Sequence, residues 1–249
     1  MQLCNNIWNI LLFIGFFVFI IFILLLFDSK LQSSLLFSSK IQSSLPRRFL
    51  AIGDSLTAGF SDHGLSFHSY SINLTNLFSS VHIPIIVDQQ GVTGEHVVPT
   101  MMKRLERILS NKTKSYYDWI IILGGTNDLA YNKNADKIFN EGLKLMYNMV
   151  LPNTRLAVMT VIENGHYLPE HKQDKERRTL NTMIKNFTEN YEDKKRICLI
   201  DLDKKIPYHS IKDINQRKAI WDDPIHLKAA GYDQMAKLIF EKLYKKIKQ

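Results

Sequence analysis

The sequence predicts an α/β protein with one parallel sheet of about five strands, covered by helices on both faces. Three observations favour this class. From residue 49 onward, short apolar runs alternate with longer amphipathic ones, and the short runs are apolar on both faces. The part of the chain from residue 49 to 249 is also long enough for a single domain with a sizeable core.

The elements follow in order along the chain. The predicted strands are residues 49–52, 83–88, 118–123, 155–161 and 197–202. The predicted helices cover residues 66–79, 95–109, 135–149, 171–190 and 227–247. Crossovers between parallel strands are right-handed, and ligands of such sheets bind beyond the carboxyl ends of the strands. The residues that directly follow each strand are therefore the first candidates for a functional site.

An uncharged apolar run occupies residues 7–27 near the N-terminus. As a helix this run would be about 30 Å long, which is enough to cross a bilayer. A cleaved signal peptide would need a positive n-region, a shorter apolar core and a small-residue cleavage site, and this run has none of these. The sequence therefore predicts a single-pass membrane anchor in residues 1–27 and a membrane localisation.

The side of the membrane on which the domain lies stays open. Lysine and arginine only follow the apolar run, which favours a cytosolic domain. Three glycosylation sequons point the other way, at Asn73, Asn111 and Asn186, but such sequons also arise by chance in a chain rich in Asn. Residues 28–48 are Ser-rich, with a repeated SK-x-QSSL segment, and are expected to act as a linker to a domain over residues 49–249.

The charge and cysteine content exclude several classes of function. The net charge is +8, but the basic residues are scattered and no nucleic-acid motif is present, so no nucleic-acid partner is expected. Cys4 and Cys198 are not expected to pair, and no Cys/His cluster has metal-ligand spacing. We therefore expect no metal and no cofactor. The oligomeric state cannot be inferred from these features.

Small and polar residues follow the predicted strands. Acyl transfer needs a nucleophile, a base, a group that orients the base, and donors for the oxyanion. Ser55 is the candidate nucleophile and His226 the candidate base, with Asp223 three residues before it. Backbone N–H groups of Ser55 and Gly91, together with the side-chain amide of Asn127, are the candidate oxyanion donors.

The sequence segments that carry these candidate residues resemble the motifs of the SGNH hydrolases, also called the GDSL esterase/lipase family. The matching residues are Ser55 in GDSL, Gly91 in QQGVTG, Asn127 in GGTND and His226 in DPIH, with Asp223 in the acidic position. The blocks occur in family order. The resemblance implies a flavodoxin-like three-layer α/β/α sandwich, no metal, and ester hydrolysis through an acyl-enzyme. Gln89 and Gln90 depart from the pattern, because many members carry Asn or a small residue just before the glycine.

The leading hypothesis is a membrane-anchored serine ester hydrolase that acts on a small-molecule acyl ester. The anchor modestly favours a lipid-derived substrate, as in a lysophospholipase or esterase. The alternatives are an acyltransferase with the same triad and a catalytically silent module that binds lipid or carbohydrate. The loops at 89–98 and 162–170 are expected to shape the pocket. Three histidines, His63, His68 and His96, lie near the motif blocks.

Two adjacent acids could orient His226, and only one can do it. We expect His226 to begin the last helix, which would place Asp223 one turn back on the same side of the chain. Pro224 biases Asp223 toward an extended conformation that turns its carboxylate to the imidazole. The sequence therefore predicts that Asp223, and not Asp222, completes the triad.

Overall fold

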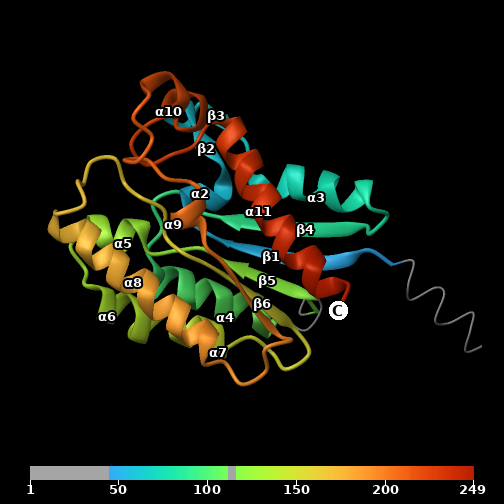
Figure 1. Ribbon diagram of the computed structural model, residues 1–249. Coiled ribbons are helices and arrows are strands. Elements are labelled where there is room, and N and C mark those ends of the chain that lie inside the picture. Colours follow the sequence, from blue (N-terminus) through green and yellow to red (C-terminus); the bar gives the residue numbers. More distant parts are fainter. Residues whose placement is uncertain (1–44, 112–115) are drawn as a thin grey trace, which may run out of the picture. The chain divides into compact units, whose positions relative to one another are not determined.

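The computed structural model describes residues 45–111 and 116–249, in which five parallel strands form the main sheet (Figure 1). The strands are β1 Arg47–Gly53, β4 Ile85–Gly91, β5 Trp119–Ile122, β6 Arg155–Met159 and β7 Ile197–Ile200, and they lie in the order β4-β1-β5-β6-β7. The second strand along the chain therefore lies outside the first, which is the flavodoxin-like order. This confirms the predicted α/β class and the parallel sheet.

The central strand β1 shows why the short runs are apolar on both faces. Phe49 and Ala51 belong to one hydrophobic cluster, and Leu50 and Ile52 belong to the other. All four side chains are fully buried. Because side chains alternate across a strand, each face of the sheet needs its own layer of helices.

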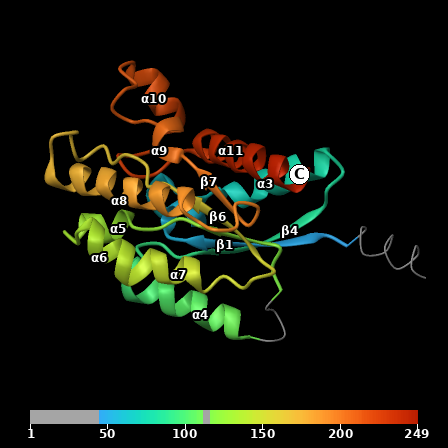
Figure 2. The ribbon, with the colours of Figure 1, turned by 60° about the horizontal axis from the view of Figure 1, so that its bottom comes forward.

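Helices cover both faces of the sheet (Figure 2). On one face lie α3 Tyr70–Ser80 and α11 Ala229–Ile247, which pack against each other. On the other face lie α4 Met102–Ser110, α6 Ala135–Ile138, α7 Lys144–Asn148 and α8 Lys172–Glu189, with the π-helical segments η2 Val97–Met101 before α4 and η3 Phe139–Leu143 between α6 and α7. The resulting α/β/α sandwich is the three-layer architecture that the resemblance implied.

Several short elements were not predicted: α2 Ser55–Ala58, β2 Phe60–Ser61, η1 Asp62–Gly64, β3 Ser66–Phe67, α5 Thr126–Ala130, α9 Leu202–Lys205 and α10 Ile214–Ile220. The helix expected from residue 66 begins at Tyr70, because Ser69 caps it by accepting the Ser71 N–H. Ser66 and Phe67 belong instead to a hairpin, in which they pair with Ser61 and Phe60.

The predicted anchor at residues 7–27 and the linker up to residue 44 lie outside the described residues. Between residues 45 and 111 and between 116 and 249, no helix combines the length and apolarity that a membrane span needs. Residues Pro46–Gln249 form one compact unit.

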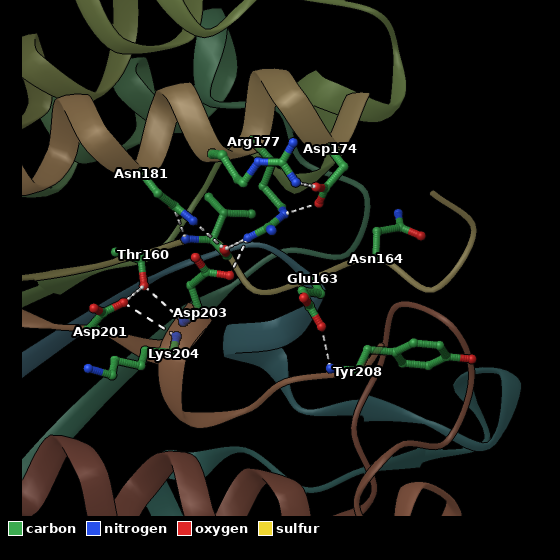
Figure 3. Close-up of polar contacts among 12 residues, drawn as sticks. Thr160, Glu163, Asn164, Asp174, Arg177, Asn181, Asp201, Asp203, Lys204 and Tyr208 are labelled. Atoms are coloured by element: carbon green, nitrogen blue, oxygen red, sulfur yellow. Dashed lines mark hydrogen bonds and ion pairs between the residues drawn. The ribbon is translucent and has the colours of Figure 1, made fainter. Parts of the chain in front are cut away.

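A buried polar network fastens α8 to the carboxyl end of β6 (Figure 3). Arg177 donates to the Asp174 carboxylate at 2.8 Å and to the Val161 carbonyl at 3.1 Å, and it also pairs with Asp203. Asn181 donates to the same Val161 carbonyl at 2.9 Å and accepts the Val161 N–H at 2.8 Å. These contacts satisfy the backbone where β6 ends, so the loop that follows leaves the sheet at a defined point.

Replacing Arg177 by Met should lower the free energy of unfolding by about 3–5 kcal/mol, because two carboxylates would lose their buried cation. The matched control is Arg178→Met. Arg178 also pairs with Asp174, but its side chain is 45% exposed, so the loss should be below about 1 kcal/mol. Urea unfolding of both variants measures the difference, and equal losses would contradict a buried role for Arg177.

Candidate active site

A single short turn at the carboxyl end of β1 presents Ser55. Asp54 caps this turn by accepting the Leu56 N–H at 3.0 Å, and Gly59 ends it with a φ of 81°. Ser55 is the first residue of the turn, so its own N–H has no partner within the helix. A side chain at Gly53 would lie 2.2 Å from the Thr57 hydroxyl, so the close packing of the turn on the strand requires glycine there.

Asp54 braces the turn from a fully buried position. Burial raises the pKa of Asp54 to about 7, although the hydrogen bond from the Leu56 N–H acts in the opposite direction. The second carboxylate oxygen of Asp54 has no partner among the described atoms, and neither have the nearby hydroxyls of Thr57 and Tyr70. Asp54 therefore supports the loop of Ser55 through its hydrogen bond with the Leu56 N–H.

Asp223 shapes the turn that carries His226. One oxygen of its carboxylate accepts the N–H groups of Ile225 and His226, each at 2.7 Å. The other oxygen lies 2.8 Å from Nδ1 of His226. A bridge between Trp221 and Leu227 closes the turn, so the backbone and the imidazole are oriented by the same carboxylate.

The structure brings Ser55, His226 and Asp223 together in one hydrogen-bonded series. His226 Nε2 lies 3.0 Å from Ser55 Oγ, and the other ring nitrogen faces Asp223. The expectation that His226 begins the last helix was wrong, because Lys228 is extended and α11 begins at Ala229. Asp223 reaches the imidazole through a closed turn, not through one turn of helix.

The surroundings of the Asp223 carboxyl keep it in its charged form, as a partner of the imidazole requires. Partial burial acts to raise the pKa of this carboxyl, but hydrogen bonds from the His226 side chain and from the N–H groups of His226 and Ile225 outweigh it. The pKa of Asp223 therefore lies below its usual range, and the group is ionised at neutral pH. Asp222 faces elsewhere, since its carboxylate accepts the Asp62 N–H at 2.7 Å.

The two other candidate oxyanion residues lie at the same edge of the sheet. Gly91 ends β4 and pairs in register with Gly53. A side chain at Gly91 would lie 2.2 Å from the Ala58 nitrogen, so the strand can approach the Ser55 turn only as glycine. Asn127 lies in α5 and donates to the Glu95 carbonyl at 3.0 Å. Among the described residues no hydrogen bond joins Asn127 to Ser55, and its amide has a second N–H to offer.

Arg104 is a site residue that sequence patterns provide no reason to select. From α4 it donates to the carbonyl of Gln90 at 2.9 Å and to that of Gly53 at 3.2 Å, and it pairs with the Glu95 carboxylate. Gln90 precedes Gly91, Gly53 lies two residues before Ser55, and the Glu95 carbonyl accepts from Asn127. One guanidinium therefore ties the strand ends beside Ser55 and Gly91 to Glu95, whose backbone carbonyl accepts from the Asn127 amide.

Asp128 holds the other end of the same loop. Its buried carboxylate accepts the Val97 N–H at 2.7 Å and pairs with Lys133. The loop at 162–170 is also joined to the turn that carries His226, because the Gly165 N–H donates to the Pro224 carbonyl at 2.7 Å.

The three other histidines near the motifs contact neither Ser55 nor His226. His68 pairs with Asp233 at 2.9 Å, His96 stacks edge-on against Tyr131, and His63 is exposed in η1. Within the part of the chain that the structure describes, no group of three or more His, Cys, Asp or Glu side chains could hold a metal ion.

Comparisons with known proteins give a family and a fold. The model of the GDSL-like lipase/acylhydrolase family matches residues 51–234. A search of curated proteins finds no match. Similar solved structures include a carbohydrate esterase family 3 from Talaromyces cellulolyticus, with a TM-score of 0.63, 16% identity, and coverage of 81% of this chain and 98% of that one.

Two further structures are similar to the same extent. The lipase/acylhydrolase from Enterococcus faecalis has a TM-score of 0.61 and 20% identity, and the match covers 78% of this chain and 94% of that one. A member of the lipolytic protein G-D-S-L family from Veillonella parvula has a TM-score of 0.60 and 16% identity, with coverage of 78% and 97%. At these identities the likeness concerns the fold.

Asp223→Asn should lower kcat by up to about 10⁴-fold, because the amide no longer stabilises the imidazolium and can select the wrong tautomer. Asp222→Asn is the matched control. It retains an oxygen for the Asp62 N–H and should leave kcat within about twofold of the parent. Both variants are measured by hydrolysis of p-nitrophenyl acetate at neutral pH. Equal rates for the two variants would show that Asp223 is not the acid that orients His226.

Arg104→Lys should lower kcat by about 10–100-fold with KM nearly unchanged, because an ammonium cannot span two carbonyls and a carboxylate as the planar guanidinium does. The pH profile of kcat should keep its shape, since Arg104 does not contact His226. Arg107→Lys, at an exposed position of the same helix, is the control and should behave as the parent. A rise in KM alone would point to substrate binding instead.

Proposed function

We propose that this chain, which belongs to the GDSL-like lipase/acylhydrolase family, hydrolyses a carboxylic ester through an acyl-enzyme on Ser55. The chain is a serine esterase of the SGNH type. The observation that carries the proposed mechanism is the hydrogen-bonded series from Ser55 Oγ to His226 and Asp223, with separations of 3.0 Å and 2.8 Å. A nucleophile, a base and an orienting acid are what acyl transfer requires.

The reaction then follows from this geometry. His226 Nε2 accepts the Ser55 proton as Oγ bonds to the ester carbonyl carbon, and the carbonyl oxygen becomes an oxyanion. When the C–O bond to the alcohol breaks, the imidazolium returns the proton to the leaving oxygen. A water molecule repeats the same steps on the acyl-enzyme and releases the acid. Asp223 holds the imidazole and balances its positive charge throughout.

The oxyanion donors are assigned to the N–H groups of Ser55 and Gly91 and to the amide of Asn127. Two of these are backbone groups, one at the start of the Ser55 turn and one at the end of β4, and their positions are fixed before the substrate binds. Preorganised donors of this kind stabilise charge that develops only in the transition state. The bracing of this region by Arg104 supports the assignment.

We further propose that residues 7–27 hold the enzyme in a membrane as a single-pass anchor. The proposal rests on the length of the uncharged apolar run. The full-length chain should stay in the membrane pellet through alkaline carbonate extraction. Recovery of a shortened chain in the supernatant would instead indicate a cleaved signal.

Ser55→Ala should abolish labelling by a fluorophosphonate probe and lower kcat by several orders of magnitude, about 10⁴-fold or more, without changing the unfolding curve. Asn127→Ala should retain labelling and lower kcat by about 10²–10³-fold with little change in KM. Substantial turnover by a folded Ser55→Ala protein would end the proposal. A parent chain that the probe does not label would favour a silent binding module.

A further inference from the structure

A short hairpin after the Ser55 turn presents two exposed apolar side chains. The strands β2 and β3, Phe60–Ser61 and Ser66–Phe67, enclose the turn η1. Leu65 is 84% exposed and Phe67 is 56% exposed. Single exposed apolar residues are common on protein surfaces, so their meaning depends on what lies beside them.

The hairpin is held firmly at its base. The Tyr232 hydroxyl donates to the Phe60 carbonyl at 2.7 Å, and the His68 N–H donates to the Gly59 carbonyl at 2.7 Å. At the turn, the Asp62 N–H donates to Asp222, which belongs to the same closed turn as His226. The exposed tip is therefore coupled to the His226 turn by a direct hydrogen bond.

A series of rings connects the hairpin to the imidazole. The ring centroid of Phe60 lies 4.5 Å from that of His226 and 5.8 Å from that of Phe67. Phe60 is thus in contact with the candidate base on one side and with the exposed Phe67 on the other. The apolar surface of the hairpin continues up to the group that transfers the proton.

The chemistry of the proposed reaction decides which half of the ester lies beside the hairpin at residues 60–67. The leaving oxygen receives its proton from His226 Nε2, so the alcohol half must lie beside the imidazole. The carbonyl oxygen is assigned to the oxyanion donors Ser55, Gly91 and Asn127, which come from the other side of the site. The hairpin next to His226 is therefore placed to contact the alcohol half and not the acyl half.

We infer that Phe60, Leu65 and Phe67 form a binding surface for a hydrocarbon alcohol, so that the substrate is a carboxylic ester of an apolar alcohol. This inference rests on the proposed esterase mechanism. An alcohol chain that covers the two exposed side chains removes apolar area from water on both partners, which favours longer alcohols.

The test is a series of alkyl acetates from methyl to hexyl acetate, hydrolysed by the full-length protein in detergent. The acyl group is constant, so any trend reports the alcohol subsite. For the parent, kcat/KM should rise by about two- to fourfold per methylene group. In Leu65→Ser/Phe67→Ser the rise should be largely lost, with the greatest deficit for hexyl acetate. Leu65→Met/Phe67→Leu should restore it.

The matched control is Leu145→Ser/Leu151→Ser, which removes two leucines that are 42% and 46% exposed in and after α7. This variant should show the parent trend. No dependence on alcohol length in the parent, an unchanged trend in the hairpin variant, or faster hydrolysis of an acetylated sugar than of hexyl acetate would overturn the inference and leave the esterase intact. Activity toward no ester, or activity that survives Ser55→Ala, would instead defeat the proposed function.

Discussion

The site depends on the close approach of β4 to the turn that follows β1. These two strands end in register at Gly91 and Gly53, and a side chain at either glycine would overlap atoms of the Ser55 turn. Because the strands are parallel, their carboxyl ends meet at one edge, and the turn of Ser55 rests directly on that edge. A larger residue at either end would push the nucleophile away from the sheet.

Two charged groups then fix the two halves of the site independently. Asp223 builds the turn that carries the imidazole, using one oxygen for backbone N–H groups and the other for Nδ1. Arg104 fixes the opposite half by joining the ends of β1 and β4 to Glu95. Each group satisfies polar atoms that the fold would otherwise leave unpaired, so stability and preorganisation arise from the same contacts.

The strands and the motif blocks could be predicted because they depend on local patterns. Runs such as Trp119–Ile122 are apolar at every position, which is what burial on both faces requires. The start of the last helix was misjudged because the backbone forms a closed turn before it. In this turn the Asp222 N–H donates to the His226 carbonyl and the Lys228 N–H donates to the Ile220 carbonyl. The hairpin at residues 60–67 was missed because its strands are only two residues long, too short for a periodic signal.

The sequence by itself determined the sheet class and the order of its elements along the chain, because local apolar patterns suffice for these. It also selected Ser55, Asp223 and His226 as candidates for a triad, through their residue types and the resemblance of the segments that carry them to a known family. Only the tertiary structure decided that His226 lies in a closed turn, that Arg104 braces the oxyanion region, and that Phe60 packs on the imidazole. The contacts of Arg104 and Phe60 join segments far apart in the chain, and the turn of His226 is closed by an irregular bridge between Trp221 and Leu227. Such contacts leave no periodic trace in the sequence, because the fold alone brings the partners together.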